Sequence, residues 1–368
     1  MATLSLCMIV KNEEPTLDRC LEQAKEFADE IIIVDTGSTD CSKEIALQYT
    51  KQVYDYIWHD DFAAARNFSF SKATMDYCMW LDADDVILPQ EQQKLIELKT
   101  TLDFLQADVV MLPYDVAFDA TGQVQITYMR ERVIKNTEQA IWIGRVHEVI
   151  TPFGNIIYED IHIRHEKVKP YDTDRNLRIY ETMQEEGHIL EPREQFYYAR
   201  ELYYHAQYEK AIEAFQKFLS MKEGWIENKI EACRQIAECF GKIGNQEKQL
   251  QSLFQSFALD LPRAETCCAI GQIYFAQANW KAAAFWYEIA LRVDKNTQSG
   301  GFVQESCYGY LPCMQLCVCY DKMGEYEKAE SYNEMGAVFQ PKSEAVRYNR
   351  NYFLQRRAKQ KIFAEEKY

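Results

Sequence analysis

Two patterns of hydrophobic and polar residues divide the chain. Up to about residue 114, short apolar runs alternate with stretches of helical periodicity, which are the signals of buried strands and amphipathic helices. The pattern predicts strands over residues 4–10, 31–35, 53–57, 79–82 and 109–114, and helices over 16–27, 39–50, 62–75 and 90–102. This alternation is typical of a mostly parallel sheet covered by helices on both faces. We therefore expect an α/β domain whose ligands bind beyond the carboxyl ends of the strands.

The second half of the chain is predicted to be helical and to contain a repeat. After shorter strands between about 122 and 167, the pattern is helical from residue 171 onward. Short motifs built around an alanine recur approximately, and we take four positions as equivalent: Ala211, Gln249, Ala283 and Ala329. Their spacings are 38, 34 and 46 residues, close to a helix-turn-helix repeat of about 34 residues. These segments resemble tetratricopeptide repeats.

Two features of this repeat depart from the pattern. Gln249 stands where the other repeats have a small residue, which indicates a degenerate second repeat. The long third spacing is explained by an insertion near 296–309, where Ser299-Gly300-Gly301 predicts a loop. The expected organisation is an α/β domain over 1–167, a helical linker over 168–193, helical repeats over 194–343 and a capping helix over 344–368.

Composition narrows the class of protein. The net charge of −16 opposes nucleic-acid binding. No apolar run approaches the roughly 18–20 residues that a membrane span needs. The first apolar run, 4–10, is too short for a signal-peptide core and meets Lys11 at once. The 12 cysteines form no C-x-x-C pair and are expected to be reduced packing residues in a cytoplasmic protein.

Carboxylates follow two of the predicted strands. Neither G-x-G-x-x-G nor a P-loop is present, so a nucleotide would have to bind through acids and a metal. Asp35 ends the second strand ahead of a predicted Ser/Thr helix cap, and it could accept hydrogen bonds from a base or ribose. The fourth strand leads into Asp82-Ala83-Asp84-Asp85, whose mutual repulsion favours a bound cation. Such acids with Mg²⁺ or Mn²⁺ are typical of nucleoside diphosphate binding.

Five motifs in order resemble those of family 2 glycosyltransferases. They lie within about the first 165 residues and are Met8-Ile9-Val10-Lys11-Asn12-Glu13-Glu14, Val34-Asp35-Thr36-Gly37-Ser38-Thr39-Asp40, Asp61-Phe62-Ala63-Ala64-Ala65-Arg66-Asn67, Trp80-Leu81-Asp82-Ala83-Asp84-Asp85 and Arg145-Val146-His147-Glu148. With its helical repeats, the chain is similar to a bacterial subgroup that includes glycocin peptide S-glycosyltransferases. The resemblance implies a GT-A-like domain that inverts the anomeric carbon.

The resemblance also implies roles for individual residues. Asp35 would contact a uracil-type base, Asp82 the ribose region and Asp84 the metal. The remaining donor-side residues are Asn12 and Glu13 in the base pocket and Arg66 near the diphosphate. His165 would be a further metal ligand. His162 competes with it, and residues three apart on a strand face opposite sides, so at most one should reach the metal.

The acceptor side is less constrained. Glu148 is the candidate base, and His147 could act instead. The structural alternative is that Arg145 and Glu148 form an ion pair that braces the loop. The helical half is expected to bind a peptide, protein or glycan acceptor or to mediate dimerisation. A repeat scaffold with an inactive transferase domain and a nucleotidyltransferase are the alternative functions.

Overall fold

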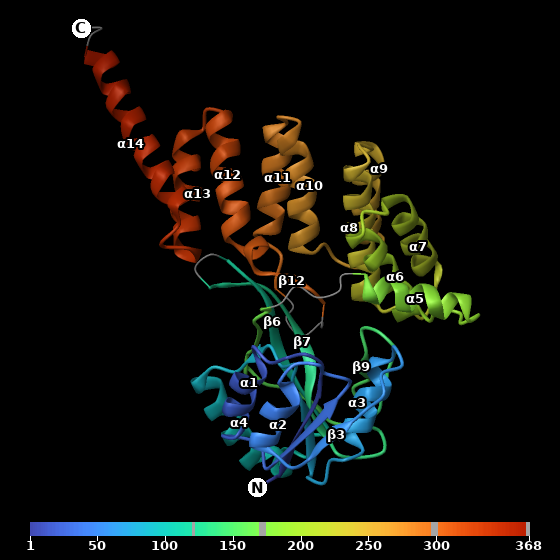
Figure 1. Ribbon diagram of the computed structural model, residues 1–368. Coiled ribbons are helices and arrows are strands. Elements are labelled where there is room, and N and C mark those ends of the chain that lie inside the picture. Colours follow the sequence, from blue (N-terminus) through green and yellow to red (C-terminus); the bar gives the residue numbers. More distant parts are fainter. Residues whose placement is uncertain (120–121, 169–173, 296–300, 366–368) are drawn as a thin grey trace. The chain divides into compact units, whose positions relative to one another are not determined.

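The computed structural model of the chain describes residues 1–119, 122–168, 174–295 and 301–365 (Figure 1). The chain divides into two compact units, one comprising Met1–Gln207 and the other beginning at Tyr208. The first contains a sheet with helices, and the second consists mainly of paired helices. An α/β region followed by an all-helical region confirms the predicted fold class.

A mixed sheet forms the centre of the first unit. Its order is β3 (Val53–Asp55), β2 (Glu30–Asp35), β1 (Leu4–Val10), β4 (Tyr77–Trp80), β7 (Val124–Lys135), β6 (Val109–Phe118), β11 (Ile163–His165) and β5 (Asp85–Val86), with β10 (Ile156–Tyr158) also beside β6. The first four strands are parallel, as predicted. The long strand β7 runs antiparallel to both β4 and β6, although the sequence suggested only shorter strands there.

Helices cover both faces of this sheet (Figure 1). They are α1 (Leu17–Ala24), α2 (Ser42–Tyr49), α3 (Phe62–Phe70) and α4 (Pro89–Leu105), whereas α5 (Arg175–Glu185) and α6 (Pro192–Tyr204) pack on one another and around Val146. Side chains alternate along β1, so Leu6 and Met8 join one buried cluster with α1 and α4, while Cys7 joins another with α3. That second cluster also includes Trp142 of β8 (Trp142–Ile143), which pairs with β9 (Val149–Ile150).

Several predicted helix ends differ from the structure by three residues or more, and two of these differences have an identifiable cause. Helix α3 begins where expected because Asp61 accepts a hydrogen bond from the amide of Ala64 at 2.9 Å, but it ends at Phe70 instead of residue 75. Thr74 is drawn out of the helix because its amide and hydroxyl both donate to Glu30, at 2.9 Å. Helix α2 begins at Ser42 and has no side-chain cap. The serine and threonine ahead of it bond a neighbouring loop instead, as described below.

The second unit consists of consecutive helices. They are α7 (Tyr208–Ser220), α8 (Ile226–Lys242), α9 (Gln246–Gln255), α10 (Ala264–Ala276), α11 (Trp280–Ala290), α12 (Tyr310–Lys322), α13 (Tyr326–Phe339) and α14 (Glu344–Glu365), with strand β12 (Val303–Gln304) and two short 3-10 turns. Neighbouring helices pack pairwise, which is tetratricopeptide architecture. Part of the predicted 296–309 insertion lies outside the described residues, and Glu305–Tyr308 forms a 3-10 turn.

Turns between successive helices show the same repeat spacing as the sequence. A left-handed residue occurs at Ala206, Gly244, Ala278 and Gly324, with φ between 56° and 82°. These positions are 38, 34 and 46 residues apart, the spacings predicted from the alanine motifs. Each such residue ends one helix and allows the next to start within a few residues. The predicted register of the repeats is therefore confirmed.

Packing explains the irregular second repeat. Ala211, Ala283 and Ala329 are fully buried, whereas Gln249 is only half-buried. A Cβ at position 241 would lie 2.7 Å from Gln249 Nε2, so glycine on the facing helix makes room for the larger side chain.

The cysteines and the helix lengths agree with two further expectations. All twelve cysteines are free, and eleven are buried, as expected of packing residues, while Cys41 is exposed. Among the helices that the structure describes, none is long and apolar enough to cross a membrane.

Candidate active site

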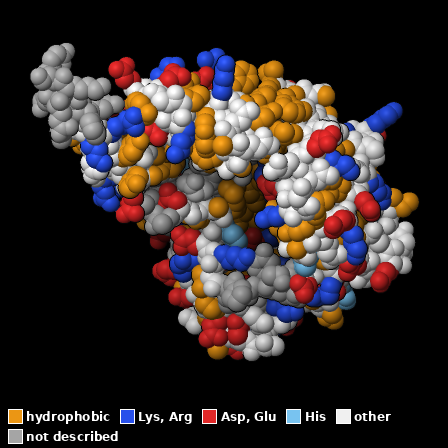
Figure 2. All heavy atoms as spheres, turned by 90° about the horizontal axis from the view of Figure 1, so that it is seen from above, with side chains coloured by type: hydrophobic (Ala, Val, Ile, Leu, Met, Phe, Trp, Pro, Cys, Tyr) orange, Lys and Arg blue, Asp and Glu red, His pale blue; other side chains and the backbone are white. Residues whose placement is uncertain are grey.

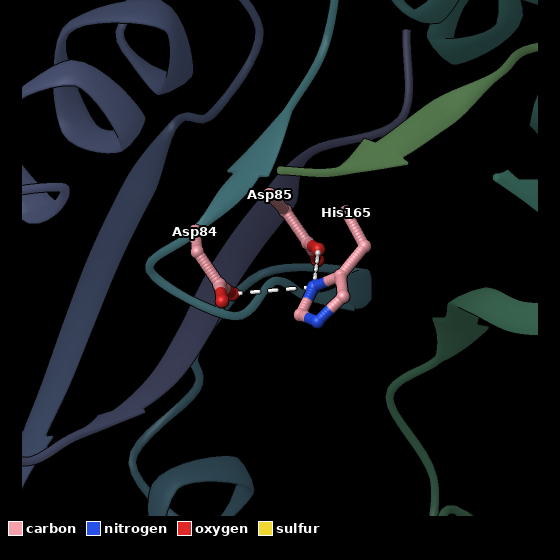
Figure 3. A group of neighbouring side chains, drawn as sticks. All are labelled: Asp84, Asp85 and His165. Carbon is pink, nitrogen blue, oxygen red and sulfur yellow. Dashed lines mark hydrogen bonds and ion pairs between the residues drawn. The ribbon is translucent and has the colours of Figure 1, made fainter. Parts of the chain in front are cut away.

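Two carboxylates and one imidazole lie together beyond the end of β4. Asp84 is in the turn after this strand, Asp85 begins β5, and His165 ends β11 opposite Asp85. His165 Nδ1 lies 3.3 Å from an oxygen of Asp84 and 3.4 Å from one of Asp85. Figure 3 shows the three side chains directed toward one another. One possible ligand atom from each lies within 4.8 Å of the others, close enough to share one cation.

The two carboxylates of this cluster stabilise a positive charge beside them. Burial opposes protonation of His165, but Asp84 and Asp85 outweigh it and raise the pKa of the imidazole to about 10. A divalent cation could supply the positive charge in place of that proton, since a histidine ligand must be neutral. Carboxylate oxygens suit Mg²⁺ and Mn²⁺, and an imidazole favours Mn²⁺ of the two. The residues present therefore fit a divalent metal site.

His162 points to a different group of residues. Its Nδ1 lies 2.9 Å from Asp115 and its Nε2 lies 3.1 Å from Asp160. The two histidines thus diverge, as the strand geometry predicted, and it is His165 that lies beside the acids. Its role as a metal ligand stays a prediction.

Asp85 is held by buried partners that the sequence did not reveal. Its oxygens accept hydrogen bonds from Tyr114 Oη at 2.9 Å and from Arg132 Nη1 at 3.0 Å. Arg132 is fully buried, its Nη1 also donates to the Trp80 carbonyl at 3.0 Å, and its guanidinium lies 3.7 Å from the Trp80 ring centroid. Asp85 also accepts a bond from the Asp82 amide at 3.0 Å. It thereby fixes the turn that presents Asp82 and Asp84.

Arg66 connects Asp82 with Glu148. Its Nη2 donates to Asp82 at 2.8 Å and its Nε donates to Glu148 at 2.6 Å, while its guanidinium packs on the rings of Trp80 and Trp142. Burial opposes ionisation of Asp82, but the charges of Arg66 and Arg132 outweigh it and lower the pKa of Asp82 to about 2. In the described part of the chain, Arg66 Nη1 has no hydrogen-bond partner. Arg66 therefore joins the predicted donor side to the predicted acceptor side.

The alternative ion pair between Arg145 and Glu148 is not formed. Arg145 instead pairs with Glu186 just beyond α5, at 2.9 Å, because Glu148 is turned toward the buried Arg66. The sequence could not indicate that Glu148 pairs with Arg66, because the two residues lie 82 positions apart.

The predicted base pocket lies at the carboxyl ends of β1 and β2. Asp35 is buried, stands beside Val10 in the parallel register, and accepts a bond from the Ser38 amide at 2.9 Å. Asn12 has a left-handed φ of 55°. Its amide donates to Ser38 Oγ at 2.9 Å, and its Oδ1 accepts from the Thr39 amide at 2.7 Å.

These bonds correct the predicted helix cap. Ser38 and Thr39 tie the loop after β2 to the loop after β1, so neither begins α2. Glu13 takes part in the same connection, because its amide donates to Ser42 Oγ at 2.6 Å. The pocket residues are thus placed together at one edge of the sheet, while their contact with a base stays a prediction.

His147 faces helix α6. Its Nε2 lies 2.8 Å from Glu201 Oε1, and its ring stacks on Tyr197 with the centroids 4.2 Å apart. Glu201 was missed from the sequence because nothing in a helical pattern marks one acid among many. Its burial, with only 7% of the side chain exposed, distinguishes it in the structure.

Part of the first unit matches a known family. Residues 5–164 match the family described as Glycosyl transferase family 2. Those residues therefore belong to this family, and the chain contains a glycosyltransferase domain.

Two curated proteins are similar to parts of this chain. A TPR repeat-containing protein of Synechococcus elongatus is 36% identical over 151 residues, which cover 41% of this chain and 36% of that protein. The glycosyltransferase SunS of Bacillus subtilis is 27% identical over 241 residues, which cover 59% of this chain and 53% of SunS. This chain thus spans about a third to a half of the length of these relatives.

Solved structures resemble the chain only partially. MamA has a TM-score of 0.33 at 20% identity, over 46% of this chain and 97% of MamA. The Mn²⁺ and UDP-glucose complex of glucosyl-3-phosphoglycerate synthase from Mycobacterium tuberculosis has a TM-score of 0.36 at 14% identity, over 51% of this chain and 80% of that one. The fold assignment above accordingly rests on sheet topology and helix pairing.

Proposed function

We propose that this protein is a metal-dependent glycosyltransferase that moves a sugar from a UDP-sugar to an acceptor, with inversion at the anomeric carbon. The observation that supports this most directly is the Asp84–Asp85–His165 cluster at the carboxyl edge of a family 2 sheet. The uracil base and the inversion rest on the family resemblance.

The donor would bind along this edge. Asn12, Glu13 and Asp35 would form the base pocket and Asp82 would face the ribose, with β1 lying between the strands that present the two aspartates. Asp84 and His165 would hold Mn²⁺ or Mg²⁺, because the oxygens of Asp85 already bind Arg132 and Tyr114. When bound, the cation would neutralise the charge of the leaving diphosphate. Arg66 would add a fixed positive charge nearby.

On the acceptor side, Glu148 and His147 are the two groups that could take the acceptor proton. They are consecutive in the chain, and Glu148 is connected to the donor side through Arg66. We propose that the acceptor is a peptide, a protein or a glycan, because the chain resembles peptide-modifying transferases.

The helical unit is proposed to bind that acceptor or a second copy of the chain. Its surface shows hydrophobic side chains among charged ones (Figure 2), and Leu261, Phe285 and Val338 are more than half exposed. Exposed apolar side chains on a repeat array are suited to protein contacts.

Product analysis tests the proposal. The full chain is incubated with Mn²⁺ and UDP-glucose, UDP-galactose or UDP-N-acetylglucosamine, and in a parallel reaction with UTP and a sugar phosphate. Release of UDP that ceases with EDTA supports the transferase. Pyrophosphate from the parallel reaction would indicate a nucleotidyltransferase, and no product in either would favour a scaffold.

A further inference from the structure

His147 is held in one orientation by helix α6. Its backbone has a φ of 53°, which histidine seldom adopts. The carbonyl oxygen of His147 accepts hydrogen bonds from Arg193 at 3.1 and 3.2 Å, and its ring lies flat on Tyr197 with an angle of 15° between the planes. Glu201 then bonds the edge of the ring. All three partners lie beyond residue 164, where the match to the transferase family ends.

The Glu201 contact determines which ring nitrogen has the proton. Burial opposes ionisation of Glu201, but His147 and Asn176 outweigh it and lower the pKa of the carboxyl. An ionised carboxylate only accepts hydrogen bonds, so Nε2 of His147 must be the donor in their 2.8 Å contact. Burial lowers the pKa of His147, and Glu201 only partly offsets this. At neutral pH the ring is therefore neutral, with an unprotonated Nδ1.

We propose that His147 is the base that takes the acceptor proton and that Glu201 is the positioning residue that fixes its ring and tautomer. The inference rests on the proposed glycosyl transfer. His147 leaves 29% of its side chain exposed, so a substrate can reach it. Glu148, by contrast, is only 12% exposed, and its carboxylate already accepts a hydrogen bond from Arg66 Nε at 2.6 Å, so it is less accessible to an acceptor than His147.

The transfer step balances with this assignment. The acceptor oxygen or sulfur forms a bond to the anomeric carbon as the bond from that carbon to the diphosphate oxygen breaks. The electron pair of the broken bond leaves with UDP, and the acceptor proton passes to His147 Nδ1. Glu201 stabilises the imidazolium that forms, in the manner of an acid that orients a catalytic histidine.

The charges around His147 predict the effect of removing Glu201. Glu201 and Glu148 raise the pKa of His147, whereas Arg200 lowers it. Arg193 bonds the backbone of His147, and the rings of Tyr180 and Tyr197 lie parallel to its ring. Replacing Glu201 by a neutral residue must therefore lower the pKa of His147 and make it a weaker base.

The first test replaces His147 by asparagine, which tolerates a positive φ and cannot act as a base. The measurement is Mn²⁺-dependent UDP release from the donor that wild type cleaves fastest, with water as the acceptor. We expect His147→Asn to reduce the rate about 100-fold or more, with UDP affinity by calorimetry changed less than about twofold. His188→Asn is the matched control, because His188 makes the same 2.8 Å bond to Glu194 but is 43% exposed.

A rate for His147→Asn above about a third of wild type would overturn the assignment. If Glu148→Gln instead abolishes UDP release while His147→Asn keeps it, the base is Glu148. If the wild-type protein releases UDP from none of the donors, both the proposed function and the base role of His147 are refuted.

The second test addresses Glu201 directly. In Glu201→Gln, the acid limb of the kcat/KM profile should move to lower pH and the plateau should fall about tenfold, whereas a purely structural contact would leave the limb in place. Nitrogen-15 NMR of the His147 ring, assigned by its loss in His147→Asn, should show the proton on Nε2 in wild type. A proton on Nδ1 would refute the positioning role, whether or not the protein turns over.

Discussion

The sheet unit and the helical unit use charge in different ways. In the sheet unit, Arg132 and Asp85 form a fully buried pair, and Arg66 is buried between two carboxylates. On the outer helices α13 and α14, the pairs of Arg350 with Glu334 and Arg357 with Glu330 lie in contact with water. Burying a charge is expensive unless it is well paired, so an arrangement of this kind is expected where it serves chemistry. This contrast supports the proposed division of roles, in which the sheet unit carries out the chemistry and the outer helices make protein contacts.

The largest effect should come from the acid nearest the proposed metal. Asp84→Asn should lower UDP release at least about 100-fold, because a main electrostatic element of the leaving-group site is lost. EDTA should lower the wild-type rate similarly. Asp160→Asn is the control, since Asp160 bonds His162 and is 86% exposed. Equal rates or equal UDP affinity in Asp84→Asn and wild type would contradict the metal assignment.

The next effect concerns stability and contrasts the two kinds of ion pair. Arg132→Met leaves Asp85 buried without its cation and should reduce the free energy of unfolding by about 3–5 kcal/mol. Arg350→Met removes an exposed partner of Glu334, and solvent screening makes its effect hard to detect. Urea denaturation of both variants checks this. Similar midpoints would remove the distinction drawn between the units.

A smaller effect should separate a regular repeat from the degenerate one. Ala283→Gln overfills a fully buried position and should destabilise the helical unit by about 1–3 kcal/mol. Gln249→Ala restores the usual small residue where Gly241 already leaves space and should change stability by less than about 0.5 kcal/mol. Thermal unfolding followed by circular dichroism compares the two. A larger loss in Gln249→Ala would contradict the packing explanation.

The smallest effect is predicted for removal of the helical unit. A fragment of residues 1–207 keeps every contact of His147 described above, and its UDP affinity should stay within about twofold of the full chain.

A shorter fragment that ends at residue 167, the predicted domain boundary, loses Glu201 and should release UDP far more slowly while still binding it. Calorimetry and UDP release on both fragments test this. Loss of UDP affinity in the 1–207 fragment would show that donor binding needs the repeats.

The sequence predicted that several candidate site residues lie together at one edge of the sheet. Asp35, Asp82 and Asp84 come directly after apolar runs, and parallel strands bring such positions to one edge. The spacing of the alanine motifs likewise predicted the register of the repeats. These features depend on residues that are close together in the sequence, so the sequence alone is enough to predict them.

The partners of these residues could not be predicted. Arg132, Tyr114 and Glu201 act through contacts with residues 29 to 54 positions away, and their own neighbours in sequence give no sign of it. The start of α2 was missed for a related reason, because Ser38 and Thr39 bond another loop more favourably than their own helix. Tertiary contacts decided both outcomes.

The distribution of thiols makes the protein convenient for spectroscopy. Cys41 is the one exposed cysteine among twelve, all of which lie in the described part of the chain. It precedes α2, next to Asp40, whose side chain accepts bonds from the Glu14 amide and from Ser42. The neighbouring charge of Glu14 raises the pKa of the Cys41 thiol, so a maleimide fluorophore should attach best at mildly alkaline pH. A single dye at the rim of the predicted base pocket would then report nucleotide arrival without any engineered cysteine.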